Sequence, residues 1–517
     1  MIGQVAGIVM LSLSVGADVE ADYVLRGAQV FDGKNEQLVK ADVAIKGDRI
    51  VAVGEFKTAG QPRVLDVTGM VVAPGFIDLH THSDFTITDR SARGSVNFLM
   101  QGVTTVVTGN CGLGRPDVGT YYKQVEEGGT GTNMLHLIPQ GSVRKEIMGV
   151  ASRAPTAEEL ESMRRLVERG MREGAWGLST GLSYLPGSFS STEELIVLAR
   201  AAGAQGGIYV SHIRNQGSQL HDAINEALEI GKQAGVPVHL SHLKIAGAQS
   251  RGTAAAALRL IDEARRQGRE VTADQYPYHA SSTSLIAMVI PPIMRSQGDF
   301  EERLANPDEL PRIRAAIARR VETRDGPERL VVATFAHRRD WQGKSLAELV
   351  KQEKKSATDL ALYMLQHGGA KMISFSMGEE DVRQIMQASY VATASDGRAR
   401  DIGTKDLFHP RDFGTFPRKI GTYAIEKKVM PLGQALRSAT GLPADVIQLP
   451  GRGYLRAGYF ADIVVFDPKT FRDKATFDEP RRHANGVSFL FVNGKLAVNR
   501  GEATGSLAGR VLRHASK

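Results

Sequence analysis

PGFIDLHTHSD, residues 74–84, decides the fold prediction because it joins a short apolar run to two histidines. The run that follows the Pro-Gly turn is typical of a buried β-strand. His80 and His82 are two positions apart, and residues i and i+2 of a strand project from the same face. Both imidazoles can therefore reach one metal ion. Since two ligands rarely suffice to hold an ion, the segment also predicts further ligands elsewhere in the chain.

Further candidate ligands stand at the ends of other apolar runs. The run IYVSH ends in His212, VPVHLSH ends in His242 and YVATASD ends in Asp396. QGVTTVVTGNCG, residues 101–112, contains Cys111, the only cysteine of the chain, which cannot close an intrachain disulfide and is a metal ligand as a thiolate. Any single one of the 13 histidines could simply end a strand at the surface. The coincidence over four runs instead favours parallel strands that deliver ligands to one rim of a barrel.

The order of the remaining segments predicts an α/β protein with a (β/α)8 TIM-like barrel. Strand-like runs alternate with helix-like runs, and this alternation predicts a parallel sheet. Metal-competent residues at the strand ends favour a closed barrel over an open sheet. The eight expected strands lie near residues 77–82, 102–110, 133–139, 175–181, 207–212, 237–242, 270–276 and 390–396.

Both ends of the chain are predicted to build a smaller domain. Residues 22–73 contain short β-like pieces separated by glycine turns, and the same pattern returns in GYFADIVVFDP and GVSFLFVNGKLAVNRG. We expect a small β-sandwich from residues 22–73 and 440–517, and a metal-dependent barrel from residues 74–439. Residues from about 286 to 350 fit no single strand-helix unit. They are expected to form a mainly helical insertion near the mouth of the site, where long loops often carry specificity.

Composition and charge exclude some classes of function. Apolar residues make up 42% and charged residues 23% of the chain, as in a soluble globular protein with a large core. The net charge is +7, but the basic residues are scattered as short pairs, so nucleic-acid binding is not expected. The apolar run from Val5 to Val15 is too short to span a bilayer and makes residues 1–21 a candidate signal peptide, with an added N-terminal strand as the alternative. The protein is therefore expected to be cytoplasmic or exported, without a membrane span.

Several motifs resemble the amidohydrolase superfamily and, within it, the N-acyl-D-amino-acid deacylases (D-aminoacylases). PGFIDLHTHSD is typical of the superfamily, whereas TGNCG with its cysteine, GLSTGLSYLPG and HPRDFGTFPR are more specific for the deacylases. YVSHIRNQG, VPVHLSHLKIAG, DQYPYHASSTSL and ADIVVFDP extend the resemblance over most of the chain. The sequence departs from the family pattern in PQGSVR, at Ile213 and in YPYHAS. These departures concern the pocket walls more than the ligands, so the chemistry is better indicated than the substrate.

The resemblance implies a zinc enzyme in which a cysteine thiolate replaces the carboxylated lysine found elsewhere in the superfamily. By motif position, Cys111, His212 and His242 would hold a tightly bound Zn²⁺, and His80, His82 and Asp396 would border a second, weaker position. The implied reaction is hydrolysis of the amide bond of a small N-acyl-D-amino acid to a carboxylate and a free D-amino acid.

Residue chemistry suggests roles for the other polar side chains. Asp396, in SDG after an apolar run, would orient the attacking water, take its proton and return it to the leaving amine. Lys244 lies two residues after His242, on the same side of an extended strand, and is the first candidate to bind the substrate carboxylate. Tyr184 is a candidate donor to the oxyanion or, equally, a packed aromatic residue. Further candidates for substrate binding are Tyr276, Ser282 and Arg214, for which a structural ion pair is at least as good an interpretation.

Two other functions remain open at this point. A cyclic amide hydrolase, similar to the dihydroorotases and hydantoinases of the superfamily, would use the same metal on a ring substrate. A non-catalytic scaffold would be expected to have lost metal ligands, whereas all six candidate ligands are present in this chain.

Overall fold

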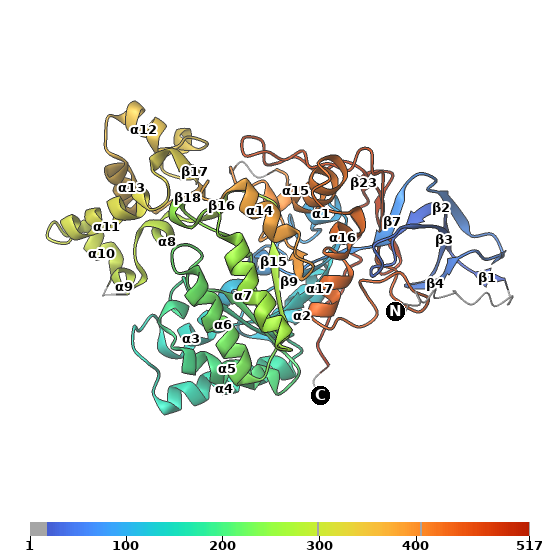
Figure 1. The fold of residues 1–517 in the computed structure, drawn as a ribbon, viewed down its shortest axis with the longest axis horizontal. Helices are drawn as coiled ribbons and strands as arrows, with labels where there is room; N and C mark the ends of the chain where they lie inside the picture. Colours follow the sequence, from blue (N-terminus) through green and yellow to red (C-terminus); the bar gives the residue numbers. More distant parts are fainter. Residues whose placement is uncertain (1–17, 297–298, 404–405, 516–517) are drawn as a thin grey trace, which may run out of the picture.

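The computed structural model describes residues 18–296, 299–403 and 406–515 (Figure 1). The candidate signal peptide, residues 1–21, therefore lies almost entirely outside the described residues. At the end of this segment, β1 (Val19–Glu20) pairs in parallel with β5 (Thr58–Ala59). No helix in the described ranges combines the length and the apolarity that a bilayer crossing requires.

Eight parallel strand positions within the described residues form the barrel at the centre of Figure 1. They are β8 (Phe76–Asp78), β9 (Val103–Thr108), β10 (Asn133–His136) with its continuation β11 (Ile138–Pro139), β12 (Gly177–Gly181), β13 (Ile208–His212), β14 (Val238–Leu240), β15 (Val271–Gln275) and β19 (Val391–Thr393). Hydrogen bonds follow the orders β10-β9-β8 and β11-β12-β13-β14-β15-β19. The predicted α/β fold with a (β/α)8 barrel is confirmed, and each of the eight expected strands is present.

The barrel closes between its first strand, β8, and its last, β19. The carbonyl oxygen of His80 accepts a hydrogen bond from the backbone N–H of Asp396 at 2.8 Å. The buried Asp78 carboxylate strengthens this junction, because its Oδ1 accepts the backbone N–H groups of both His80 (3.1 Å) and Ser395 (3.0 Å). Closure therefore brings candidate ligands from the two ends of the barrel sequence side by side.

Helices cover the outside of the barrel. They include α2 (Val118–Gly128), α3 (Gln140–Met148), α4 (Ala157–Arg172), α5 (Thr192–Gly203), α6 (Leu220–Ala234), α7 (Ala254–Arg266) and α14 (Glu379–Met386). Shorter helical segments are α1 (Val96–Leu99), α15 (Arg411–Pro417), η7 (Arg418–Glu426), α16 (Leu432–Arg437) and α17 (Gly441–Val446). Helix α4 shows why such segments form: Thr156 and Glu159 make a reciprocal capping box at its start. Its buried residues Met163, Val167 and Met171 recur every four positions and give it one apolar face.

Strands from both ends of the chain form one nine-stranded sheet beside the barrel, at the right of Figure 1. They are β2 (Tyr23–Val30), β3 (Val39–Lys46), β4 (Arg49–Gly54), β6 (Arg63–Asp66), β7 (Val71–Pro74), β20 (Ile463–Phe466), β21 (Val487–Val492), β22 (Lys495–Asn499) and β23 (Glu502–Ala503). The two ends meet where β7 pairs antiparallel with β20. Apolar residues from the two ends of the chain, such as Ile45 in β3 and Phe491 in β21, share one core. We propose that these strands constitute the terminal domain, whereas α17, also within 440–517, packs against the barrel residues Ile77 and Leu79.

We propose that the inserted segment, expected at about 286–350, extends from Ser281 to Ser374. It contains β16 (Ser281–Ser284), α8 (Leu285–Val289), α9 (Pro292–Arg295), α10 (Phe300–Ala305), α11 (Leu310–Glu322), β17 (Leu330–Thr334), α12 (Leu346–Glu353), α13 (Ala357–Gln366) and β18 (Lys371–Ser374). The boundaries differ because β16 and β18, which open and close the segment, pair antiparallel with each other. Apolar residues of its helices and strands form a separate core, and the segment projects from the barrel at the upper left of Figure 1.

Candidate metal centre and active-site cavity

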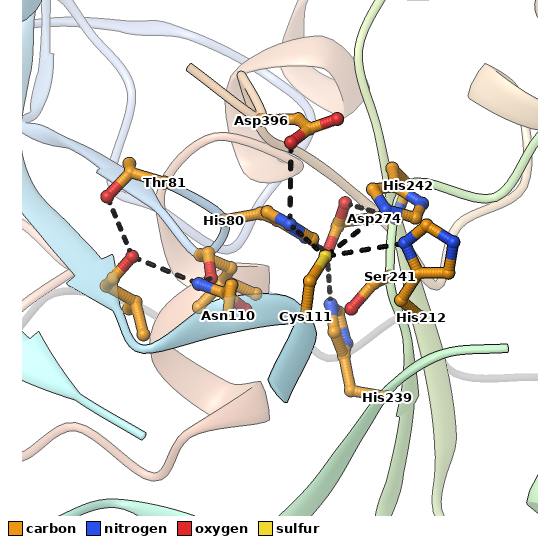
Figure 2. Close-up of polar contacts among 12 residues, drawn as sticks. His80, Thr81, Asn110, Cys111, His212, His239, Ser241, His242, Asp274 and Asp396 are labelled. Atoms are coloured by element: carbon orange, nitrogen blue, oxygen red, sulfur yellow. Dashed lines mark hydrogen bonds and ion pairs between the residues drawn. The ribbon is translucent and has the colours of Figure 1, made fainter. Parts of the chain in front are cut away.

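Cys111 lies at the centre of the candidate metal cluster (Figure 2). Its Sγ is 3.3 Å from His80 Nε2, 3.5 Å from His212 Nδ1 and 3.5 Å from His242 Nε2. Zn–S and Zn–N bonds of ordinary length at a tetrahedral angle hold sulfur and nitrogen about 3.5 Å apart. The donor atoms therefore already have the spacing that a shared zinc ion requires.

The donor atoms form two overlapping sets that share the cysteine. One set is Cys111, His212 and His242, and the other is Cys111, His80 and His82; within each set the ligand atoms lie within 4.8 Å of one another. Asp396 adjoins the second set, with its Oδ1 3.0 Å from His82 Nε2. The cluster fits one ion held by the first set and a second position bordered by the other.

Asp274 is a buried carboxylate that contacts two histidine side chains and the backbone of a third histidine at the cluster. Its Oδ2 lies 3.4 Å from His80 Nδ1 and 2.9 Å from His239 Nε2, and its Oδ1 accepts the backbone N–H of His242 at 2.7 Å (Figure 2). A His80 that donates its Nδ1–H to Asp274 keeps the lone pair on Nε2, which faces Cys111. Asp274 was not among the predicted site residues. The only sequence feature that could have indicated it is its position as a carboxylate within a barrel strand, β15.

The other two imidazoles also have partners on the nitrogen that faces away from the sulfur. His212 Nε2 lies 2.8 Å from Ser183 Oγ, so an Nε2–H donor leaves Nδ1 free for a metal. His242 Nδ1 lies 3.0 Å from the side-chain amide of Gln216 and 2.8 Å from Lys244 Nζ. A His242 that ligates through Nε2 carries its proton on Nδ1, where it can donate to an amide oxygen but no longer accept from an ammonium. Metal binding is therefore expected to release Lys244 from this contact.

Three residues of the cluster adopt left-handed backbone conformations. The φ angles are 55° at Cys111, 36° at His242 and 51° at Asp396. Such conformations are unfavourable for residues other than glycine and persist when the surrounding structure fixes them, frequently at functional sites. Each of these residues lies two or three positions after the end of its strand, β9, β14 or β19, so the local turn directs the side chain toward the common centre.

The electrostatics of the cluster favour an anionic sulfur and an anionic Asp396. Burial alone would raise the pKa of the Cys111 thiol, but the imidazoles of His80, His242 and His212 lower it well below its usual value. Burial would likewise raise the pKa of Asp396, but Arg411 and then His82 lower it well below the ordinary carboxyl value. Arg411 Nη1 contacts Asp396 Oδ2 at 2.6 Å. The thiolate is the metal-binding form of cysteine, and an ionised carboxylate is the form that accepts a proton.

A cavity of about 1190 Å³ opens next to the cluster, between the barrel and the inserted segment. Eight of the predicted site residues border it, namely Tyr184, His212, Arg214, His242, Lys244, Tyr276, Ser282 and Asp396. The remaining predicted residues, His80, His82 and Cys111, complete the adjoining cluster.

The Tyr276 hydroxyl is buried and has no hydrogen-bond partner among the described residues. Burial lowers the pKa of Lys244 to about 7. The Tyr276 hydroxyl is thus available to a polar ligand, and Lys244 becomes available when its contact with His242 is lost.

Arg214 borders the cavity, but its guanidinium is paired within the protein. Its Nε and Nη2 donate to the Glu226 carboxylate at 2.9 and 2.8 Å, and its Nη1 and Nη2 donate to the backbone carbonyls of Ser188 and Ser190, both at 3.0 Å. The structure thus contains the ion pair that the structural interpretation of Arg214 expects. Arg411 contacts Asp396 but was not among the predicted site residues, although it lies in the HPRDFGTFPR motif.

Comparisons with known proteins agree with this geometry. The profile of the Amidohydrolase family matches residues 63–498. D-aminoacylase of Alcaligenes xylosoxydans xylosoxydans is 36% identical over 514 residues, which cover 95% of this chain and 97% of that protein. N-acyl-D-glutamate deacylase of the same organism is 34% identical over 514 residues, with 95% and 96% covered. The structure of N-acyl-D-glutamate deacylase from Bordetella bronchiseptica, complexed with zinc and a phosphonate mimic of the tetrahedral intermediate, has a TM-score of 0.82 at 32% identity. The structural alignment covers 96% of this chain and 100% of the Bordetella protein.

Replacing Cys111 by alanine or serine is expected to remove most of the bound zinc and to abolish activity, because two imidazoles without the thiolate hold the ion poorly. Metal content after purification, measured by mass spectrometry, tests this directly. The exposed substitution His221→Ala, in α6, is the control and should leave the zinc content unchanged. Full zinc occupancy in folded Cys111→Ala protein would exclude Cys111 as a ligand.

Proposed function

The chain belongs to the D-aminoacylases of the amidohydrolase family, and from this premise we infer that it is a zinc-dependent hydrolase of N-acyl-D-amino acids. The products are a carboxylate and a free D-amino acid. The observation that carries the inference is the Cys111 sulfur among three imidazoles, beside a cavity that also contains Asp396 and Lys244. When bound in this cluster, zinc supplies a Lewis acid and activates water for attack at neutral pH.

We propose that Asp396 transfers the proton of the reaction. It is ionised because of Arg411, and it borders both the metal cluster and the cavity. Its carboxylate can accept a proton from the attacking water and then donate that proton to the amide nitrogen, which must be protonated before the amine departs. Arg411 holds Oδ2, so Oδ1, on the side of His82, is the oxygen that carries out the transfer.

The substrate carboxylate is assigned to Lys244 and Tyr276, with Ser282 on the same cavity wall. Lys244 Nζ lies 2.8 Å from Gln216 Oε1, and both residues border the cavity. The unpartnered Tyr276 hydroxyl is a second donor. Lys244 has lost solvation without gaining an ion-pair partner among the described residues, so a substrate carboxylate would restore a favourable environment for its charge.

Tyr184 is the proposed donor to the oxyanion that forms at the amide carbon. Its ring packs against that of His212 with the centroids 4.8 Å apart, and the residue borders the cavity. Burial, followed by the nearby charges of Cys111 and Asp396, raises the pKa of its phenol, so the hydroxyl stays protonated and can donate a hydrogen bond.

The reaction is tested with the zinc-loaded protein and a panel of N-acetyl-D-leucine, N-acetyl-D-glutamate, their L-enantiomers, a hydantoin and dihydroorotate. The expected result is release of acetate and free amino acid, faster from the D than from the L compounds. Turnover of the cyclic amides alone would establish the ring-opening alternative. Absence of bound zinc together with absence of turnover on added zinc would favour the scaffold.

Substituting Asp396 by asparagine is expected to lower kcat by about 10²- to 10⁴-fold, the usual contribution of a positioned acid or base, while the zinc of Cys111, His212 and His242 is retained. Steady-state kinetics and metal analysis on the same sample measure both effects. The exposed carboxylate Asp401, substituted in the same way, provides the control. A kcat equal to that of the unmodified protein would remove the proton-transfer role from Asp396.

Truncating Lys244 to alanine should act mainly on KM. Loss of one charge-assisted hydrogen bond, about 1.5 to 3 kcal/mol, corresponds to a KM higher by roughly 10- to 100-fold for N-acetyl-D-leucine. N-acetyl-D-leucinamide, which lacks the carboxylate, should be much less affected. Equal losses on both compounds would show that Lys244 does not bind the carboxylate.

A further inference from the structure

His136 joins the two ends of the chain segment that carries Cys111. It is the last residue of β10, and its side chain is fully buried. Its Nδ1 lies 2.8 Å from Thr108 Oγ1, and its Nε2 lies 2.9 Å from the carbonyl oxygen of Arg115. Thr108 is the last residue of β9, and the segment 108–115 that begins there contains the cysteine. One imidazole therefore holds the chain on both sides of the sulfur ligand.

A single neutral tautomer of His136 satisfies both contacts. A carbonyl oxygen can only accept, so Nε2 carries the proton and donates to Arg115. Nδ1 then accepts from the Thr108 hydroxyl. Burial lowers the pKa of the imidazole below its usual value despite the nearby Asp84 carboxylate, which keeps the ring neutral. Because the protein engages both nitrogens, His136 is not itself available as a metal ligand.

The segment between these two contacts has an unfavourable backbone. The φ angles are 79° at Gly109, 55° at Cys111 and 66° at Gly112. A left-handed conformation at a residue other than glycine, such as Cys111, persists only when its surroundings fix it. Ser179 fixes the turn itself, because its Oγ accepts the backbone N–H of Gly112 at 3.1 Å. The chain that enters and leaves the turn decides where the sulfur lies relative to the histidine ligands.

The imidazole of His136 is itself held in place by its neighbours. The ring of Tyr121, in α2, packs edge-on against it with the centroids 4.8 Å apart. A Cβ atom added at Gly109 would come within 2.8 Å of His136 Cε1, so the ring lies directly against the backbone of the segment. Asp84 Oδ1 accepts the N–H of Gly109 at 2.5 Å and lies 3.8 Å from His136 Nδ1. A shift of the ring therefore requires a shift of the segment that carries the cysteine.

We propose that His136 is a positioning residue for zinc: it holds the Cys111 sulfur at metal-ligand spacing before the ion binds, and it thereby sets the zinc affinity of the site. This inference rests on the zinc site of the proposed function. Among the described residues, the hydrogen bonds of His136 go to Thr108 and Arg115, and His136 does not border the cavity, so it acts through Cys111. A ligand already in place loses less conformational freedom on binding.

The zinc affinity of the full-length protein tests the proposal. The zinc Kd is measured by competition with a chelator, starting from folded, metal-free protein and without substrate. His136→Leu removes both hydrogen bonds and is expected to raise Kd by about 10- to 100-fold, the usual effect of losing a residue that orients a ligand. Thr108→Val keeps the shape of the side chain and removes one hydrogen bond, so its effect should be smaller. The double variant should resemble His136→Leu, because the two substitutions break the same contact.

Conservative variants distinguish positioning from a merely structural role. In His136→Gln the side-chain amide can still donate to the Arg115 carbonyl, and in His136→Asn the side-chain oxygen can still accept from Thr108, so each should keep part of the affinity that His136→Leu loses. Ile50→Ala, in the core of the terminal domain, is the control: its cavity lowers Tm, but Kd should not change. A Kd equal to that of the unmodified protein in folded Thr108→Val and His136→Leu would overturn the proposal. If His136→Leu does not fold, the isosteric Thr108→Val decides in the same way.

The test also separates this inference from the proposed function. An unmodified protein that binds zinc tightly but hydrolyses no N-acyl-D-amino acid would overturn the deacylase and leave the role of His136 intact, since Kd is measured without substrate. Turnover by the unmodified protein, together with an unchanged zinc Kd in the variants, would overturn only the role of His136.

Discussion

Closure of the barrel between β8 and β19 is the constraint on which the rest of the structure depends. The Asp78 carboxylate accepts backbone N–H groups from both strands, and the His80 carbonyl accepts that of Asp396. Without this junction, residues separated by more than three hundred positions would not share one centre. With it, the strand ends bring four nitrogen and sulfur donors together at metal-ligand spacing. The chemistry of the site is thus a consequence of the topology of the sheet.

The sequence predicted the fold and the site residues wherever the pattern that indicates them lies within one short segment. Apolar runs ending in His212, His242 or Asp396 locate both a strand and a ligand, so the barrel and the proposed metal residues were predictable together. Asp274 and Arg411 were missed because their meaning comes from partners across the barrel. The ion-pair partner of Arg214 was not identified because Glu226 lies on the next helix, α6, where it looks like an ordinary surface acid.

The inserted segment was the least predictable part for a related physical reason. Its first strand, β16, is the polar sequence SSTS, and all four residues are only partly buried. A strand of this kind lacks the apolar pattern that marks a barrel strand, so its pairing with β18 is not visible before the chain is folded.

The pairing of β16 with β18 places the beginning and the end of the inserted segment next to each other, and the segment has a core of its own. A unit that leaves and re-enters a scaffold at neighbouring points can be exchanged without altering the path of the strands on either side. β15 and β19 remain hydrogen-bonded neighbours whatever length of chain connects them. Selection can therefore diversify ligand recognition in this lineage by remodelling one removable module, while the hydrolytic apparatus is inherited intact.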